Sequence, residues 1–349
     1  MFKITGIGKT DETFITKILR MSEGDAIESV ANRLRKLRIF STVAHADGGL
    51  VVSEEKRSIG FSGDTTGRVP KGYFNMRLPN LFRRAENLDV SVSTARDIDI
   101  KFSKPFISGS LGFLNIFGIA STMASPHEDY PHIRASVELE SDNQSVSVGR
   151  ERIGYLDQTF LEIRKKMSML EIKAKAGVFD SKPCRMFVKG QIGMCASKLL
   201  TRNVFMDMNA SMGTIFGEPH IAERYYLGEG VGGYKAMSIS PSTSGLKIGG
   251  GSFIEIAQRI GLCVGGAKAY MFGSLGCVSE GKGVVRDLLI DRQAYLTKNN
   301  ECLGASVGVG ISVPVMRSKD GPVIKTSFAI PLTDNEQVQR LQFGFDMDF

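Results

Sequence analysis

The chain has 349 residues, a formal net charge of +7 and a hydrophobic content of 42%. It contains no run of about 18 apolar residues, which excludes a helical membrane protein, and its lysines and arginines form no basic run, which disfavours binding to nucleic acid. The five cysteines are widely spaced without a C-x-x-C pair and predict neither a disulfide framework nor a zinc site: Cys184, Cys195, Cys263, Cys277 and Cys302.

Residues 1–57 predict a small mixed domain. Residues 2–7 can form a strand, Thr10 can cap a helix that ends before Gly24, and Asp25 can cap a second helix with its apolar residues on one face. A hairpin completes the domain, with strands at residues 39–46 and 50–53. The predicted order is therefore strand, helix, helix, strand, strand.

From Ser58 onward, apolar and polar residues alternate, as in Ile133, Ala135, Val137 and Leu139 with polar residues between them. About fifteen or sixteen strands can be placed after residue 60, and many have about ten residues or more, whereas strands of globular proteins average about 5–6. Long strands favour a membrane barrel over a soluble sandwich. Residues 58–349 are therefore predicted to form a transmembrane antiparallel β-barrel of about 16 strands, which makes the chain mainly β.

One long segment, at about residues 216–245, interrupts the strands. Its length indicates a functional loop. Gly228, Gly230 and Gly233 match G-x-G-x-x-G, but neither a following helix nor a surrounding βαβ unit is predicted, so a dinucleotide site is rejected. Glycines here instead allow the backbone to fold tightly against a wall.

The last ten residues, 340–349, alternate strictly, with apolar residues at every odd position. A soluble sheet rarely ends on an unprotected edge strand with several large apolar side chains on one face, because such an edge promotes aggregation. Closure of the sheet into a barrel removes the edge. The pattern therefore predicts a final barrel strand with its apolar face toward lipid.

The small domain resembles a POTRA domain, the repeat found in front of outer-membrane β-barrel assembly proteins. Together with the all-strand remainder, the late loop and the terminal strand, it makes the whole chain resemble the BamA-type barrel-assembly superfamily. Within that superfamily, the chain is most similar to the channel subunit of the mitochondrial sorting and assembly machinery (SAM). The resemblance implies one POTRA-like domain followed by a barrel of about 16 strands, with the late loop folded inward.

The loop signature of this family, V/I-R-G-F/Y, corresponds to Val231, Gly232, Gly233 and Tyr234, and its arginine is missing. The matching wall motif, F-x-D-x-G, corresponds to Phe272, Ser274 and Gly276, and its acid is missing. Loss of both charges is milder than loss of one, which would leave an uncompensated charge costing about 3–5 kcal/mol if fully buried. We therefore expect the loop still to fold inward, held by backbone hydrogen bonds and by Tyr234.

The terminal strand is similar to the eukaryotic barrel-targeting signal, through Gln342, Gly344, Met347 and Phe349. The first residues lack the apolar core of a secretory signal and the arginine-rich helix of a transit peptide. A bacterial outer-membrane protein would need a secretory signal, so we expect cytosolic synthesis in a eukaryote. The expected location is the mitochondrial outer membrane, or that of a mitochondrion-related organelle.

The resemblance implies that function lies at a lateral seam between residues 67–78 and residues 340–349. An opened seam can template an incoming strand by strand addition. The expected function is insertion of β-barrel precursor polypeptides without enzymatic activity, cofactor or metal. The expected partners are those precursors, peripheral SAM-type subunits and outer-membrane lipid, with no nucleic acid. The four histidines are expected to be isolated surface or turn residues: His45, His127, His132 and His220.

Three other interpretations remain open. A passive solute pore shows the same alternation but needs neither a POTRA-like domain nor a long loop. A protein-translocation channel, such as a two-partner secretion transporter or a plastid import pore, shares both features. A soluble ligand-binding sandwich explains the long strands and the apolar end poorly.

Overall fold

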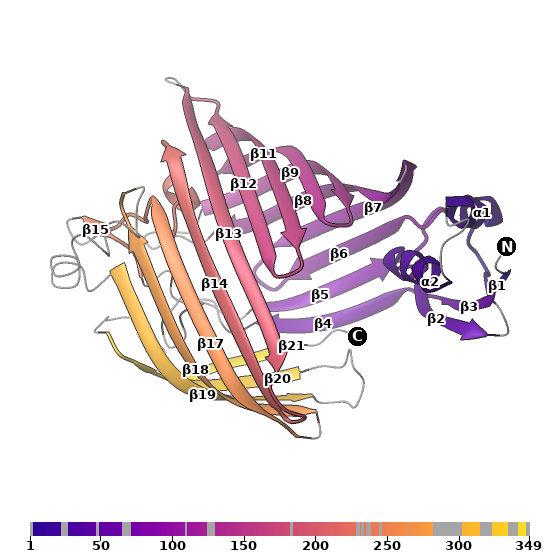
Figure 1. Cartoon of the computed structure of the whole chain (residues 1–349). Helices are drawn as coiled ribbons and strands as arrows, with labels where there is room; N and C mark the ends of the chain where they lie inside the picture. Colours follow the sequence, from indigo (N-terminus) through magenta and orange to yellow (C-terminus); the bar gives the residue numbers. More distant parts are fainter. Residues whose placement is uncertain are drawn as a thin grey trace.

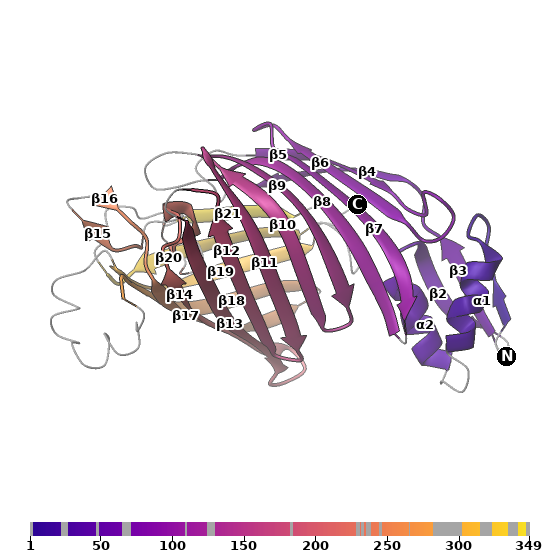
Figure 2. The same cartoon turned by 90° about the horizontal axis from the view of Figure 1, so that it is seen from above.

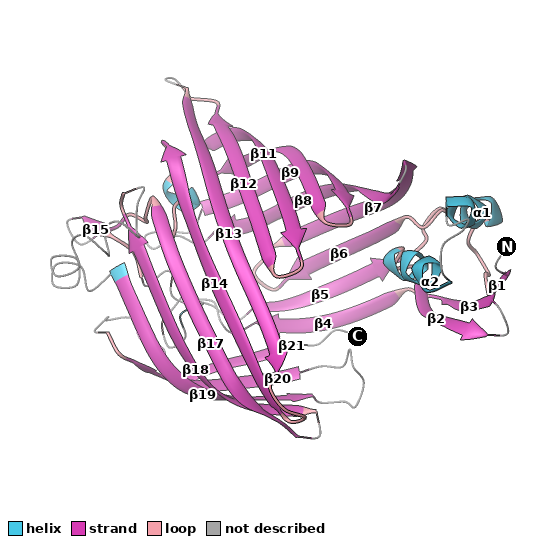
Figure 3. Cartoon of the chain, viewed as in Figure 1, coloured by secondary structure: helices cyan, strands magenta, loops and turns pink. Residues whose placement is uncertain are grey.

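The computed structural model describes most of the chain, with gaps between the described ranges. These are residues 3–21, 27–46, 49–64, 71–108, 110–123, 130–181, 184–227, 231, 234, 239–243, 246–264, 266–281, 302–314, 323–333 and 341–346. The chain forms a small mixed domain at one end of a large curled sheet, and strands dominate (Figures 1 and 3). No helix among the described residues is long and apolar enough to cross a membrane.

The small domain has the predicted element order. It consists of β1 (Lys3–Thr5), α1 (Glu12–Met21), α2 (Ile27–Lys36), β2 (Phe40–Ala46) and β3 (Gly49–Glu54). The sheet order is β1-β3-β2, with β1 parallel to β3 and β2 antiparallel to it. The apolar stripes of both helices cover the sheet, and the buried core includes Ile18, Val30, Leu34, Leu50 and Val52.

The helix boundaries follow from local hydrogen bonds, and Asp11 rather than the predicted Thr10 caps α1. The carboxylate of Asp11 accepts from the backbone N–H of Thr13 at 2.9 Å, which satisfies a free donor in the first turn of α1. After α2, Arg38 adopts φ 53°, a left-handed conformation that ends the helix and turns the chain into β2. The helices therefore begin and end where side chains and backbone can satisfy the terminal polar groups.

The remaining strands form one antiparallel sheet in which chain neighbours pair. They are β4 (Ser58–Asp64), β5 (Lys71–Leu78), β6 (Asn87–Ser93), β7 (Ile98–Ser108), β8 (Ser110–Met123), β9 (Tyr130–Ser141), β10 (Gln144–Ile153), β11 (Leu156–Met167), β12 (Leu170–Phe179), β13 (Arg185–Leu199), β14 (Val204–Gly217), β17 (Ser252–Val264), β18 (Ala267–Ser279), β19 (Leu303–Pro314), β20 (Val323–Pro331) and β21 (Leu341–Asp346). The prediction of a large antiparallel sheet is confirmed.

The sheet curls so that the late strands return toward the early ones (Figure 2). Alternation then gives it an outward and an inward face. Ile133, Leu139, Val148 and Val309 are each more than half exposed on the outward face, and their inward neighbours are mostly polar. This large exposed apolar face exceeds what single surface hydrophobic residues would give.

The two ends of the sheet meet at β21 and β4, where the structure pairs one position, Phe345 with Gly63. Among the described residues, the predicted closure is therefore present as a single pair, whereas β20 and β21 share a ladder of six. The prediction that residues 67–78 form the first strand is wrong, because β4 precedes them and β5 begins at Lys71. Glycines at positions 60 and 63 weaken the strand pattern of β4, so alternation marks it less clearly than the strands that follow.

The small domain is joined to the large sheet by polar contacts at the end of α2. The side-chain amide of Asn87 donates to the Leu37 carbonyl at 3.2 Å, and Arg77 donates to the Arg38 carbonyl at 3.1 Å. Nζ of Lys36 lies 2.6 Å from Oδ1 of Asp142 in the β9–β10 turn. The free carbonyls at the helix end are thus satisfied by the large sheet, which fixes the orientation of the small domain.

Glu54 closes the small domain by holding the turn after β1. Its carboxylate accepts from the backbone N–H groups of Gly8, Lys9 and Thr10 at 3.2, 2.9 and 2.8 Å, and from the Thr10 hydroxyl at 2.6 Å. Burial alone would raise the pKa of Glu54, but these hydrogen bonds outweigh it and lower the pKa below its ordinary value. Glu54 therefore stabilises the fold above its unfolded pKa, and this stabilisation is lost as the pH falls through the folded pKa.

We expect Glu54→Gln to weaken this turn by about 1 kcal/mol, because a neutral amide accepts hydrogen bonds less strongly than a carboxylate. Amide hydrogen exchange, corrected for the intrinsic pH dependence of exchange, measures protection at residues 8–10. In the original chain, protection should decrease as the pH is lowered through the pKa of Glu54. In Glu54→Gln, protection should be weaker and should depend little on pH. Glu12→Gln, at an exposed side chain in α1, is the control. If protection in Glu54→Gln depended on pH as strongly as in Glu12→Gln, the role given to Glu54 would be contradicted.

Candidate functional site

The segment between β14 and β17 returns across the inward face of the large sheet. It begins with a short 3-10 helix, η1 (Ile221–Glu223), and includes a two-residue strand pair, β15 (Ser242–Thr243) and β16 (Leu246–Lys247). Figure 1 places β15 at the end of the sheet away from the small domain. The segment pairs with itself, because Leu227 and Ile239 exchange backbone hydrogen bonds of 3.0 and 2.7 Å.

The predicted loop and wall motifs meet in the structure. Val231 is fully buried, and its carbonyl accepts from the Ser306 hydroxyl at 2.6 Å. The Ser306 hydroxyl also lies 2.8 Å from that of Ser274 on β18. A Cβ at Gly276 would lie 2.4 Å from Cγ2 of Val231, so a wall position without a side chain admits the loop. Phe272 instead packs beside Gly308, away from these contacts.

Tyr234 anchors the other part of the loop motif. Its side chain is 1% exposed, and its hydroxyl lies 2.9 Å from the Ala305 carbonyl on β19. The same hydroxyl is 2.6 Å from the Thr333 hydroxyl, just after β20. These contacts agree with the expected inward loop, held by backbone bonds and Tyr234. Gly232 and Gly233 lie outside the described residues.

A buried ionic cluster, which the sequence did not predict, holds the start of the loop. Glu223 is 5% exposed, and its Oε1 lies 2.5 Å from Nζ of Lys175 on β12 and 3.1 Å from Nε2 of Gln158 on β11. Both Lys175 and Gln158 also bond to the carboxylate of Glu151 on β10. Glu151 and Gln158 are almost fully buried. The cluster therefore ties the loop to three neighbouring strands.

Lys189 and His132 complete the cluster. Nζ of Lys189 donates to the Glu223 carbonyl at 2.8 Å and lies 4.6 Å from the centre of the Tyr225 ring. Nε2 of His132 lies 3.2 Å from Oε2 of Glu151. The expectation that His132 is a surface or turn residue is wrong, because it lies in β9 and is 8% exposed. Its place on the inward face of a strand explains the burial.

Register explains why the cluster needs an acid from the loop. Lys175 and Lys189 lie directly opposite each other on β12 and β13, and like charges in opposing positions repel. Glu223 contacts both lysines and supplies the missing charge. The sequence places the two lysines on polar faces of their strands. That they lie opposite each other depends on the strand register, which alternation does not determine.

The hydroxyl of Tyr225 donates to the Gly190 carbonyl at 2.8 Å, and its ring packs on Phe253 at 4.4 Å between centroids. Burial, and then the charge of Glu223, raise the pKa of Tyr225, so the hydroxyl stays protonated. Burial also lowers the pKa of His220, whose neutral ring accepts from the backbone N–H of Ala222 at 3.2 Å. The start of the loop is thus held mainly by hydrogen bonds and one ionic cluster.

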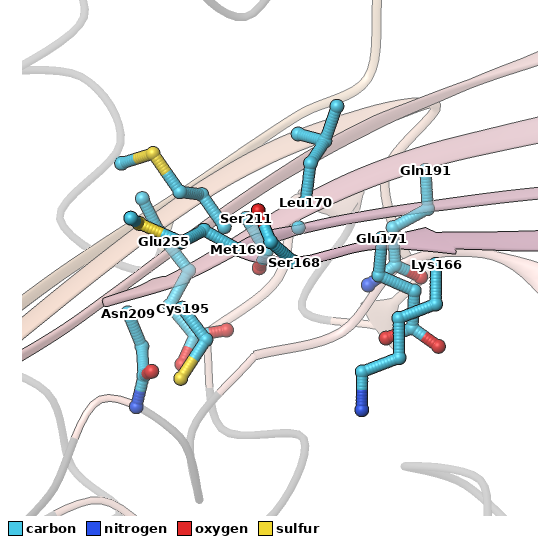
Figure 4. Close-up of a pocket in the computed structure, with 13 residues that line it drawn as sticks. Lys166, Ser168, Met169, Leu170, Glu171, Gln191, Cys195, Asn209, Ser211 and Glu255 are labelled. Atoms are coloured by element: carbon cyan, nitrogen blue, oxygen red, sulfur yellow. The ribbon is translucent and has the colours of Figure 1, made fainter. Parts of the chain in front are cut away.

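A hollow lies on the inward face near the ends of β11–β14 and β17 (Figure 4). Its lining includes Gln191, Cys195, Asn209, Ser211 and Glu255. The lining is largely polar, and it also includes Lys166 and Glu171. It is best described as part of the polar interior.

The seam contains the remaining predicted residues. In β21, Gln342 pairs with Ser327 and Gly344 with Lys325 of β20, while the other edge of β21 meets β4 at one position. Met347 and Phe349 lie outside the described residues. The predicted site residues therefore fall into two groups: the loop with its wall, and the seam. Tyr234 of the first group contacts Thr333, which follows β20, the strand paired with β21.

We expect Glu223→Gln to release the start of the loop, because two opposing, partly buried lysines would then lose the carboxylate that contacts both of them. Removing one partner of a buried pair costs about 3–5 kcal/mol. Hydrogen exchange at residues 220–227 should become at least tenfold faster, whereas Glu218→Gln, at an exposed loop carboxylate, should not change it. Adding Lys175→Met to Glu223→Gln should restore part of the protection. Unchanged exchange in Glu223→Gln would contradict the role of the cluster.

A steric variant tests the other anchor. Gly276→Ala should displace Val231, because the new Cβ would lie 2.4 Å from Cγ2 of a short, buried side chain. Gly273→Ala on the same strand is the matched control, since its Cβ would have nothing within 4 Å. Exchange at residues 231 and 234 should accelerate in the first variant only. Equal exchange in the two variants would place the loop away from this wall.

No family model matches the chain, and no curated protein matches its sequence. Among solved structures, BamA from Haemophilus ducreyi lacking POTRA domains 1–3 is similar with a TM-score of 0.64 and 13% identity, over 99% of this chain and 84% of that one. CdiB from Escherichia coli (TM-score 0.49, 11% identity, 99% and 75%) and CdiB from Acinetobacter baumannii (0.47, 13%, 89% and 66%) are also similar. The chain therefore shares the fold of the BamA structure.

Proposed function

We propose that this chain is an outer-membrane β-barrel of the BamA type that inserts β-barrel precursors into the membrane. The observation that carries the proposal is the junction of β21 and β4, which share one paired position among the described residues. Every other junction of the sheet is a ladder of several residues. A junction with so few hydrogen bonds opens at the lowest cost, and it then exposes two strand edges.

The membrane supplies the reason for a template. An unpaired backbone group in hydrocarbon costs several kcal/mol, so an incoming strand must be paired as it enters. The edges of β4 and β21 offer that pairing by strand addition. The exposed apolar face of the sheet faces lipid, and no covalent chemistry, cofactor or metal is required.

The other parts have supporting roles in this proposal. The small β-α-α-β-β domain acts as a POTRA domain and meets precursors and peripheral subunits of the SAM type. The loop, through Tyr234 and Thr333, braces the wall beside the seam. The resemblance of the loop motif and of the last strand to the SAM channel subunit supports the outer membrane of a mitochondrion or a related organelle as the location.

Disulfide locking of the seam tests the function in a background without the five native cysteines. Continuing the register from Phe345 and Gly63 places Asp346 opposite Ser62, so Asp346→Cys with Ser62→Cys forms the lock. Gln342→Cys with Ser327→Cys locks the intact β20–β21 ladder as the control. We expect the seam lock to slow precursor insertion into proteoliposomes at least tenfold, reversibly on reduction, and the control lock to leave it unchanged.

Equal insertion with a locked seam would contradict strand templating. A passive pore would be favoured if the reduced protein did not accelerate insertion and small solutes passed through both locked forms. Passage of unfolded polypeptide into the vesicle lumen without insertion would favour a translocation channel.

A further inference from the structure

The outward apolar rows of three strands each carry a lysine near the rim nearest the small domain, and on β7 and β11 one more apolar residue, Phe106 or Met167, follows it. On β11 the row runs through Leu161 and Ile163 to Lys165. On β13 it runs through Ile192 and Met194 to Lys198. On β7, in the same way, Lys104 follows Ile98 and Ile100. Because alternate residues share a face, all three lysines point outward with these rows.

The position of this rim follows from the turns. Lys165 pairs with Gln144, beside the β9–β10 turn whose Asp142 contacts the small domain. Lys198 pairs with Met206 near the β13–β14 turn. Exposed apolar side chains lie at this rim as well, including Met169 in the β11–β12 turn at 59% and Leu199 at the end of β13 at 67%. The rim thus combines apolar tips with cations.

Within the described part of the chain, these three lysines form no ion pair. Their directly paired neighbours are uncharged: Gln144 and Ile172 for Lys165, Met206 for Lys198 and Leu114 for Lys104. All three side chains are exposed. Their charge is therefore available to a partner outside the chain.

The opposite rim is arranged differently. Its outward arginines on β10 are paired, Arg150 with Asp180 at 2.5 Å and Arg152 with Asp157 at 2.8 Å. Asp157 and Asp180 continue the outward rows of β11 and β12, so each positive charge there meets a negative one on the same face. Among the described strand residues, the outward lysines at the rim nearest the small domain have no ion pair, whereas the outward arginines of β10 at the opposite rim do.

The spacing of the two rims fits a bilayer. Asp157 and Lys165 are eight residues apart on β11, which is about 27 Å along a strand and roughly 20 Å along the membrane normal at the usual tilt. The hydrocarbon band around such barrels is about 25 Å tall. The lysines therefore lie where hydrocarbon ends, with their stems along the apolar row and their ammonium groups at the level of the phosphates.

Resting on the proposed membrane location, we propose that this rim binds the headgroups of anionic phospholipids in the leaflet that faces the small domain. Lysines near a membrane surface each contribute about 1 kcal/mol of attraction to anionic lipid. The paired rim opposite has no such preference. The chain thereby distinguishes the two leaflets by charge.

Electron spin resonance with spin-labelled lipids tests the proposal on the full chain in phosphatidylcholine vesicles. The motionally restricted fraction measures lipid at the protein surface. We expect spin-labelled phosphatidylserine to be enriched about twofold or more over spin-labelled phosphatidylcholine. The variant Lys104→Gln/Lys165→Gln/Lys198→Gln should remove most of the enrichment. The control Lys101→Gln/Lys166→Gln/Lys268→Gln makes the same charge change on inward faces and should retain it.

A salt titration of the original chain keeps the test independent of variant folding. Raising ionic strength to about 1 M shortens the Debye length to about 3 Å and should abolish the enrichment. A restricted fraction without preference for the anionic lipid, or with a preference that survives the outward substitutions, would overturn this proposal while leaving the membrane barrel intact. Absence of any restricted fraction would overturn the membrane location itself, and the lipid surface with it.

Discussion

Backbone pairing is the constraint on which the rest of the structure depends. A sheet that crosses hydrocarbon must satisfy its N–H and C=O groups internally, and neighbouring strands from β4 to β21 do so through continuous ladders. The single position shared by Phe345 and Gly63 is the exception. Among the described residues this junction has the shortest pairing, and in the proposed function it is therefore the place where an external strand can gain the most hydrogen bonds. Its weakness follows from the short pairing, and no special side chain is required.

The loop solves a separate problem inside the curled sheet. Contacts of its start reach β11, β12 and β13 through Glu223, and contacts of Val231 and Tyr234 reach β18, β19 and the residue after β20. A segment held by contacts with two parts of the wall resists displacement better than a segment held by only one of them. The family pattern places a positive charge on the loop and an acid on the wall. In this chain the loop contributes the acid, and the wall contributes Lys175 and Lys189, at a different set of strands.

Periodicity predicted the kinds of elements well, because a switch from 3.6-residue to two-residue spacing is visible without any tertiary information. Periodicity did not predict the inward loop, which, like the link between the motifs that contain Val231 and Gly276, was expected from the resemblance alone. It failed at Ser58–Asp64, where two glycines dilute a short strand. It also failed at Glu223 and His132, whose burial depends on which residues lie opposite on neighbouring strands. Alternation specifies faces, whereas register depends on turns and packing.

The same physical rule accounts for paired and unpaired cations in this chain. Where the loop covers the wall and excludes water, Lys175 and Lys189 occur with Glu151 and Glu223, because a lone buried charge is costly. Where an outward row reaches the rim beside the small domain, Lys165 and Lys198 have no acid beside them. Their ammonium groups are not buried there, because water can solvate them and a lipid phosphate can pair with them. Charge pairing thus follows the medium that each face meets, and a difference in pairing between two rims indicates a difference in what surrounds them.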